Sequence, residues 1–308
     1  MKDQRFILVI VIILLVIIVS IINPKFIRLT NIMTILQQIS VLGILTMAMA
    51  MLLISGNIDL SIGNMMTLSA VVMATALKNG QSLAVGVVLA ILVSMLCGLI
   101  NGVIITKSKC IPLIITLGTS QVFYGASLLI TGGSFMSFNG ELEFMRKVAL
   151  FDIIPLMVLL MVLVVVFVHF LINKTKFGRR IFAIGGNEKN AYLSGVKVDL
   201  YKILTYVISG GMVAIAGIVF AARMNSIAPA AGSGYELDAL VAAVIGGVTF
   251  DGGRGTISGA ILGCLLTGVI SSAMDILGVH AYWKIAATGT IIVVAVVISN
   301  LENIRKRV

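Results

Sequence analysis

Few residues of this 308-residue chain have the types and spacing that covalent chemistry requires. The glycine-rich sequence GGRG at 252–255 lacks the Lys and the Ser or Thr that would hold a nucleotide phosphate, and the pattern G-x-x-x-x-G-K-[ST] does not occur in the chain. The two histidines, His169 and His280, lie far apart and suggest neither a metal site nor a Ser-His-Asp arrangement. We therefore expect no catalytic residues, no bound metal and no cofactor held by this chain.

The polar residues of interest are those that interrupt or border strongly apolar sequence. They are Asn57 and Asp59 before one apolar stretch, Thr116, Thr119 and Gln121 within another, and Glu236 and Asp238 at the start of a third. Polar groups inside a membrane commonly mark a route for a solute. The alternative is structural, because carboxylates cap helix N-termini and Thr hydroxyls bond to their own helix. We treat all seven as candidates for a translocation pathway.

The elements that position these residues must be membrane-spanning helices. Apolar residues make up 59% of the chain and charged residues 11%, which excludes an ordinary soluble domain. Since about 20 apolar residues cross a bilayer, we predict an all-α polytopic protein with about ten transmembrane helices. The expected spans are 6–22, 32–54, 61–77, 82–105, 111–131, 152–172, 203–223, 235–250, 256–275 and 282–299.

The ten spans predict two halves of opposite orientation within a single domain, 1–308. The first half (about 1–131) and the second half (about 152–308) each hold five spans. Because five is an odd number, equivalent spans of the two halves run in opposite directions, as in an inverted repeat. The third and eighth spans are the shortest, and short segments at equivalent positions indicate a solute pathway. Two glycine pairs, Gly98 with Gly102 and Gly259 with Gly263, suit close packing between helices of the same chain better than a dimer contact.

The distribution of positive charge predicts the orientation. With both termini on the cytoplasmic side, most basic residues fall in cytoplasmic segments, as membrane proteins prefer. These are Lys2, Arg5, Lys107, Lys109, Lys174, Lys176, Arg179, Arg180, Lys189, Lys197, Lys202, Arg254, Arg305, Lys306 and Arg307, which are 15 of the 22 Lys and Arg residues. The net charge of +10 thus reflects membrane topology, and no nucleic-acid partner is expected.

One long loop, 173–202, stands out on the predicted cytoplasmic side. Asn187 suits the N-cap of a short helix, Glu188 complements the helix dipole, and Gly195 suits the left-handed position after the last turn. About two turns of helix are marginal alone in water, so this helix must pack on the membrane domain or on a partner. The loop is either a docking site for another protein or a basic loop that follows the charge rule.

The longest segment on the other side, 132–150, carries both signs of charge. Glu141, Glu143, Arg146 and Lys147 are candidates for docking a partner protein there, together with 225–234. An ordinary solvated loop is the alternative.

Five sequence motifs make a resemblance specific. They are GNIDLSIGNMMTLSA (56–70), PLIITLGT (112–119), GGNEKNAYLSGVKV (185–198), NSIAPAAGSGYELDALVAAVIGG (225–247) and GGRGTISGAILG (252–263). Together they resemble the permease subunits of ribose-type ABC monosaccharide importers, in both halves and in the same order. Phe250, Asp251 and the stretch 286–289 depart from the commonest ribose pattern, which leaves the sugar open.

The resemblance implies a transport subunit of a bacterial inner membrane, paired with a second permease copy or a close paralogue. It also implies cytoplasmic ATPase subunits, which use ATP and Mg²⁺, and an extracytoplasmic sugar-binding protein, while membrane lipid surrounds the chain. The coupling helix for the ATPase would then comprise Gly186, Asn187, Ala191, Leu193, Ser194 and Gly195. The rival function is an ion-coupled secondary transporter, but the acidic residues cluster at span ends rather than inside the membrane.

Overall fold

The computed structural model describes residues 2–147, 149–150 and 154–280, with scattered positions between 282 and 293. The described chain is predominantly helical, because in lipid a helix pairs its backbone groups within one segment. In chain order the elements are α1 (Lys2–Ile22), η1 (Pro24–Ile27), α2 (Leu29–Ile54), α3 (Ile62–Lys78), α4 (Leu83–Ser108), α5 (Pro112–Thr131), β1 (Met136–Ser137), α6 (Phe144–Lys147), β2 (Ala149–Leu150), β3 (Ile154–Pro155), α7 (Leu156–Lys174), α8 (Lys176–Gly186), α9 (Glu188–Leu193), α10 (Val198–Met224), β4 (Ser226–Ile227), α11 (Tyr235–Ile245) and α12 (Ile257–Ile276).

Seven helices of the described chain are long and apolar enough to cross a membrane: α1, α2, α4, α5, α7, α10 and α12. Their ends lie within five residues of the predicted span ends. The protein is therefore a multi-pass membrane protein. Of the short spans, α3 has 17 residues, as predicted.

The eighth predicted span, 235–250, is wrong in length. Helix α11 has 11 residues, or about 16 Å of helix, which is too short to cross a bilayer. Gly246 and Gly247 end the helix, and Gly247 has a φ of +85°. Hydropathy continues through this turn, so it did not reveal the helix end. The tenth predicted span, 282–299, lies outside the described residues apart from scattered positions.

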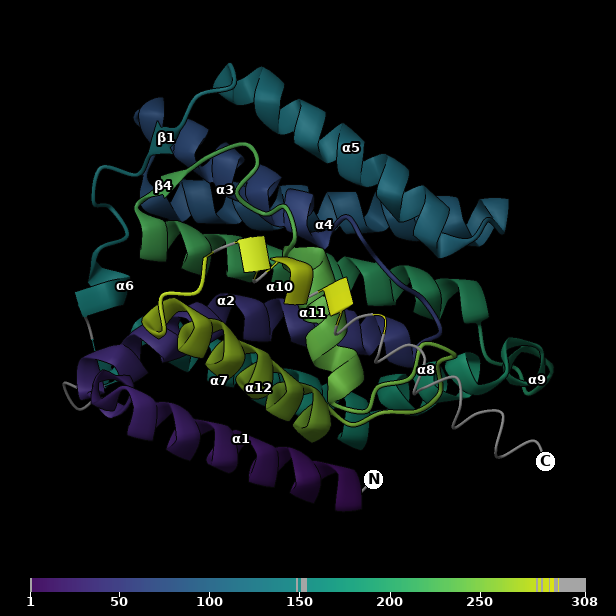
Figure 1. The fold of residues 1–308 in the computed structure, drawn as a ribbon. Coiled ribbons are helices and arrows are strands. Elements are labelled where there is room, and N and C mark those ends of the chain that lie inside the picture. The colour runs from purple at the N-terminus through teal and green to yellow at the C-terminus, as the bar shows by residue number, and fades with distance from the viewer. Residues whose placement is uncertain are drawn as a thin grey trace.

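The long helices lie side by side in one bundle (Figure 1). Helices α8 and α9 lie at one end, together with the start of α1, and we call this the α8–α9 end. Elements α6, β1 and β4 lie at the opposite end, the β1–β4 end. Helices α2, α4 and α7 run toward the α8–α9 end, whereas α1, α5, α10 and α12 run away from it.

Helix α2 forms the centre of the bundle, and its side chains from 39 to 54 are almost all buried. The main packing pairs follow a pattern: α10 packs on α3 and α4, whereas α2 packs on α11 and α12. Helices α3 and α4 also pack together, as do α11 and α12. Helix α1 lies along α12, but α7 lies mainly along α2.

The glycine pairs pack helices within the chain, as predicted. A Cβ on Gly98 would collide with a backbone carbonyl of α10, and a Cβ on Gly102 would lie 3.0 Å from the Cα of Ile203 in α10. In the same way, Gly259 and Gly263 abut backbone atoms at the end of α11. Small residues thus let α4 approach α10 and let α12 approach α11.

Candidate coupling site and solute pathway

Helix α8 begins the segment at the α8–α9 end, and the sequence analysis missed it. Thr175 caps α8 by accepting a hydrogen bond from the Gly178 N–H at 3.3 Å. Gly178, Ile181 and Ile184 are buried. The spacing of these residues is typical of one buried helix face, so periodicity could have revealed α8 within the loop.

Helix α9 confirms the predicted short helix. The Asn187 side chain accepts a hydrogen bond from the Asn190 N–H at 2.9 Å, and Gly195 follows the helix with a φ of +80°. Ala191 is 4% exposed and packs with Ile184 and Val198. The helix is therefore held on the bundle through Ala191.

This burial corrects one detail of the predicted coupling face. Ala191 points into the protein and offers nothing to a partner, whereas Tyr192 and Leu193 are 70% and 72% exposed. Ser194 is also exposed. An exposed Tyr-Leu pair on a helix at the end of the bundle is a compact apolar surface of the kind that partner proteins bury.

Three chain segments meet beside this helix: the 55–61 linker after α2, the last turn of α8, and the 246–256 loop between α11 and α12. The Gly253 N–H donates a hydrogen bond to the Ile54 carbonyl at 2.9 Å. A Cβ on Gly185 would collide with that carbonyl and lie 2.5 Å from the Gly253 nitrogen. A Cβ on Gly252 would lie 2.7 Å from the Cα of Gly56. We call these four glycines the glycine junction.

The junction brings backbone directly against backbone. Gly56, Gly252 and Gly253 have φ values of +74°, +79° and +65°, a region that glycine occupies without strain. The three segments therefore have no free space between them at this contact. Sequence reasoning assigned GGRG to a turn and did not find this contact.

The 55–61 linker is also fixed by buried polar contacts. Oδ1 of Asp59 accepts hydrogen bonds from the Ser61 N–H at 2.8 Å and from the Ser61 hydroxyl at 2.6 Å, and Oδ2 accepts one from the Asn101 amide at 3.2 Å. The Tyr206 hydroxyl donates to the Ile58 carbonyl at 2.9 Å. Asp59 is fully buried, and burial raises the pKa of its carboxyl.

These contacts fasten the linker to α4 and α10. Asn57 belongs to the same linker, and its amide donates to the Ser55 carbonyl at 3.1 Å. The structure thus gives Asn57 and Asp59 clear local roles. Their role in a solute pathway stays a prediction.

The three polar residues of α5 do not share one face. Thr116 is buried against the linker, where its hydroxyl oxygen accepts the Leu60 N–H at 3.1 Å. The Thr119 hydroxyl donates to the Thr116 carbonyl at 3.3 Å, and Gln121 is exposed on the outer surface of the helix. Only Gln121 of the three therefore faces fully away from the bundle in this single chain.

The first turns of α3 and α11 lie beside each other inside the bundle. Gly63 and Gly232 are so close that a Cβ on either would collide with the backbone carbonyl of the other. The Gly232 N–H donates to the Thr67 hydroxyl oxygen at 2.8 Å. Helix α11 therefore begins within the bundle rather than at its β1–β4 end.

The acidic residues of α11 lie at this meeting point. Oε1 of Glu236 accepts a hydrogen bond from the Gly234 N–H at 3.2 Å, so Glu236 caps the helix. Asp238 lies in the first turn and is half-buried. This bond accounts for Oε1 of Glu236, whereas its Oε2 is buried without a hydrogen-bond partner. A pathway role for both carboxylates stays a prediction.

At the β1–β4 end the structure joins the two segments that the sequence analysis placed together. Strands β1 and β4 pair antiparallel, with Met136 opposite Ile227. The Asn225 side-chain oxygen accepts the Gly140 N–H at 3.0 Å. Glu141, Glu143 and Arg146 are exposed beside this pair, and Lys147 is the last residue of α6.

No group of three or more His, Cys, Asp or Glu side chains in the described part of the chain is arranged to hold a metal ion. Asp59, Thr116 and Glu236 make hydrogen bonds within the chain.

Comparison with known proteins identifies the family. Residues 31–296 match the family described as "Branched-chain amino acid transport system / permease component". The ribose import permease protein of Bacillus subtilis is 38% identical over 300 residues, which cover 97% of this chain and 91% of the relative.

Two further relatives agree. The ribose import permease protein of Escherichia coli K12 is 33% identical, and its galactose/methyl galactoside import permease protein is 36% identical. Each alignment covers 92% of this chain and 90% of the relative. No solved structure matches the chain. On this similarity, which spans nearly its whole length, the chain belongs to this family of transport permeases.

Proposed function

We propose that the chain forms the pathway of an ATP-driven importer for a monosaccharide, a ribose-like pentose or a related sugar. The support is the similarity to permeases named for ribose and for galactose or methyl galactoside. The chain has no nucleotide-binding motif, so ATP and Mg²⁺ are used by a separate ATPase subunit and the chain itself holds no cofactor. Its place is the bacterial cytoplasmic membrane, with both termini in the cytoplasm.

The proposed architecture is one domain of ten helices in two inverted halves, about 1–131 and 152–308, with the coupling loop 173–202 between the membrane-spanning parts. The packing pairs support it, because α10 with α3 and α4 corresponds to α2 with α11 and α12. The positive charge near the α8–α9 end supports a cytoplasmic position for that end.

The proposed partners are a second permease copy or a close paralogue, an ATPase subunit at the α8–α9 end and a sugar-binding protein at the β1–β4 end. The last would contact Glu141, Glu143, Arg146 and Lys147 beside the β1–β4 pair. A second copy facing α5 would turn Gln121 toward a pathway between the copies. Lipid surrounds the rest, and no nucleic acid is involved.

The glycine junction is the observation that carries the proposed mechanism. The ATPase would bind Tyr192, Leu193 and Ser194, while Gly186 is the last residue of α8 and Asn187 and Gly195 lie at the two ends of α9. A movement of α8 would then reach α2 and α3 through Gly56, and α11 and α12 through Gly252 and Gly253.

The route of the sugar would pass the first turns of α3 and α11. Helix N-termini present partial positive charge and N–H donors, and paired short helices line solute sites in other transporters. A neutral sugar needs hydrogen-bond partners and little net charge. The junction would thus open or close one end of a route that passes these two helix starts.

The direct test is uptake by proteoliposomes that contain this chain, the ATPase and the binding protein. We expect uptake of labelled ribose or a related monosaccharide that requires ATP and the binding protein and that persists when ionophores abolish ion gradients. Uptake that follows an ion gradient without ATP would instead show a secondary transporter.

A variant tests the coupling surface separately. Leu193→Glu places a charge in the exposed apolar pair without filling any packed space, so we expect normal membrane assembly but loss of sugar-stimulated ATP hydrolysis. The matched control is Leu29→Glu, which is similarly exposed, at 62%, but lies at the other end of the bundle. Equal activity of the two variants would contradict docking at Leu193.

A further inference from the structure

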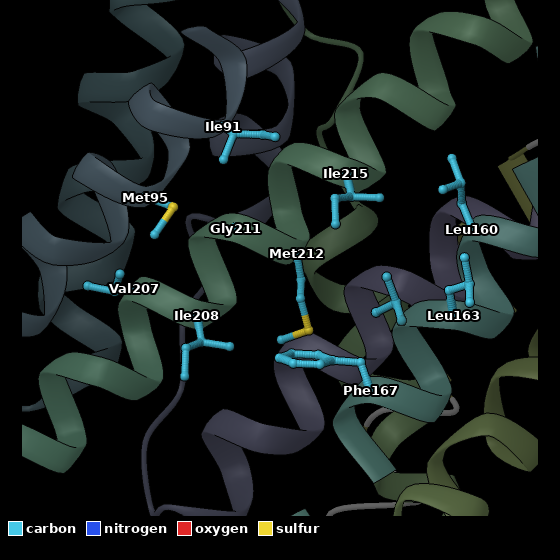
Figure 2. A pocket seen from close by; sticks show the side chains of 11 residues that line it. Ile91, Met95, Leu160, Leu163, Phe167, Val207, Ile208, Gly211, Met212 and Ile215 are labelled. Carbon is cyan, nitrogen blue, oxygen red and sulfur yellow. The ribbon is translucent and has the colours of Figure 1, made fainter. Parts of the chain in front are cut away.

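A groove between α4, α7 and α10 has a volume of about 450 Å³, which is within the common range of ligand pockets, roughly 300–1,000 Å³. Its lining includes Ile91 and Met95 of α4, Leu163 and Phe167 of α7, and Ile208 and Met212 of α10. Figure 2 shows these side chains around the open space, and the only atoms other than carbon in them are the methionine sulfurs. A polar solute would find no hydrogen-bonding side chain there.

The groove opens on the side of the bundle. Leu163 and Phe167 on one wall are 55% and 51% exposed. On the other wall, Gly211 has no side chain, and its nearest neighbour would be the Met95 side chain at 3.7 Å from an added Cβ. Since α4, α7 and α10 are membrane-spanning helices, the open side faces the hydrocarbon region.

Basic and aromatic residues continue the walls of the groove toward the α8–α9 end. Lys174 is two turns beyond Phe167 on the same face of α7, and Tyr201 is two turns beyond Ile208 on the same face of α10, about 10 Å along each helix. Arg180 donates a hydrogen bond to the Tyr201 hydroxyl and lies over its ring, 4.9 Å from the centroid. Lys174 and Arg180 are both exposed.

From this arrangement we infer a binding site for an anionic phospholipid of the leaflet at the α8–α9 end. One acyl chain lies in the groove and the phosphate group lies near Lys174 and Arg180. Charge complementarity selects an anionic headgroup, because basic residues at a membrane surface attract anionic lipids. The carbon and sulfur lining selects the acyl chain.

The helices that line the groove are connected to the coupling segments. Helix α10 forms one wall and also carries Tyr206, which bonds to the 55–61 linker. Helix α7 forms the other wall and leads directly into α8 and the glycine junction. A lipid in the groove therefore holds together two helices that are both connected to the segments at the junction.

Quenching by brominated lipids tests the site. Trp283 is the one tryptophan of the sequence, so Trp283→Phe gives a background in which Ile208→Trp reports on the groove. Leu14→Trp on the exposed surface of α1 is the control, since Leu14 is 52% exposed. The probes are bilayers that contain brominated phosphatidylglycerol or brominated phosphatidylcholine.

We expect the groove tryptophan to be quenched at lower mole fractions of phosphatidylglycerol than of phosphatidylcholine, and the control tryptophan to show no preference. In the parent protein we expect each basic residue to favour phosphatidylglycerol over phosphatidylcholine about fivefold. Replacing Lys174 and Arg180 together by Gln should abolish this preference. Equal quenching by both lipids at the groove would overturn the anionic site. No quenching by either lipid would show that another protein segment or a second copy fills the groove.

A second measurement guards against a probe that disturbs the groove. Gly211→Trp fills the space between α4 and α10, whereas Leu14→Trp adds a large side chain to the exposed surface of α1. Native mass spectrometry of the protein purified with phosphatidylglycerol should show one retained lipid fewer for Gly211→Trp than for Leu14→Trp. Equal lipid counts would also overturn the proposal.

Discussion

The glycine junction and the groove between α4, α7 and α10 are opposite solutions to packing within one bundle. At the junction, backbone meets backbone, and a Cβ on Gly185, Gly252 or Gly253 would collide with it. At the groove, three helices leave about 450 Å³ unfilled by protein. We therefore expect the segments at the junction to move as one unit, whereas the walls of the groove are connected through the proposed lipid.

Helices α1 and α7, which are equivalent in the proposed repeat, also differ in how they pack. Helix α1 packs along α12, and Arg5 of α1 donates a hydrogen bond to the Ser258 hydroxyl at 2.9 Å. In the proposed inverted repeat the counterpart of this pair is α7 with α4, but in the described chain α7 packs mainly on α2. The groove thus lies where the repeat would place a helix contact, beside the helix that leads into the coupling segment.

Gly185→Ala should have the largest effect, because its Cβ would collide with backbone rather than with a side chain that can turn away. Overpacking costs about 1–3 kcal/mol where neighbours can adjust, and we expect sugar uptake to fall about tenfold or more. The measurement is uptake per ATP hydrolysed in proteoliposomes. Gly186→Ala is the matched control, since an added Cβ there would meet nothing within 4 Å. Similar uptake by both variants would remove the basis for transmission through the junction.

Asp59→Leu should destabilise the linker side of the junction. It leaves the Ser61 N–H and the Ser61 hydroxyl without their buried acceptor, at about 1–3 kcal/mol for each unpaired group, while the Asn101 amide keeps its bond to the Ser61 hydroxyl oxygen. Asp59→Asn should cost much less, because its oxygen can keep both bonds from Ser61. The Asn101 amide can turn over so that its oxygen, which is buried without a partner, accepts from the new amide. Thermal unfolding in detergent measures both variants, and an Asn variant as unstable as the Leu variant would argue against this network.

The charge of Asp59 adds a pH test. Burial raises the pKa of this carboxyl in the folded protein, so the folded state binds the proton more tightly than the unfolded chain does. Stability from this group is complete below the ordinary pKa of Asp and decreases as the pH rises toward the raised pKa. Asp59→Asn should lack that decrease, and an unchanged pH profile would assign it to other groups.

Asn225→Ala probes the β1–β4 end and should have a moderate effect. Asn225 has a φ of +52°, and its side chain accepts the Gly140 N–H. Losing this hydrogen bond and placing Ala in the left-handed region should cost about 1–2 kcal/mol. Asn139→Ala is the control for the backbone effect alone, since Asn139 has a φ of +50°. Equal loss of thermal stability would show that the cross-loop bond contributes nothing.

Gly211→Ala should have the smallest effect and the opposite sign. The added methyl group meets the Met95 side chain at ordinary contact distance, and Ala is favoured over Gly inside a helix by about 1 kcal/mol. We therefore expect an unchanged or slightly raised unfolding temperature and normal transport. A marked loss of stability would mean that the groove is packed as tightly as the junction.

Much of the bundle could be predicted from the sequence, because hydropathy and length determine where a chain crosses a membrane. The seven long helices and the short α3 follow from apolar runs. Helix α9 follows from Asn187 and Gly195, whose side-chain chemistry acts locally. The spacing of Gly178, Ile181 and Ile184 indicates α8, but the basic residues around them favour a loop.

The rest depends on contacts between distant segments. No local pattern reveals that Gly185 meets Gly56 and Gly252, or that Ala191 points into the bundle rather than toward a partner. Thr116 and Gln121 are five residues apart on α5, and their different surroundings arise only when α3 packs on one side of that helix. The length of α11 depends on two glycines within an apolar run.

The central claim is that α9 moves as one unit with the loop between α11 and α12. Spin labels at Lys189→Cys of α9 and Arg254→Cys, both exposed positions, measure this directly in a background where the exposed Cys110 is Ser. A second pair, Lys189→Cys with Lys107→Cys at the end of α4, serves as the reference. Between the nucleotide-free and vanadate-trapped complexes we predict a constant distance for the first pair and a changed distance for the second. A first pair whose distance changes as much as that of the second would contradict the account.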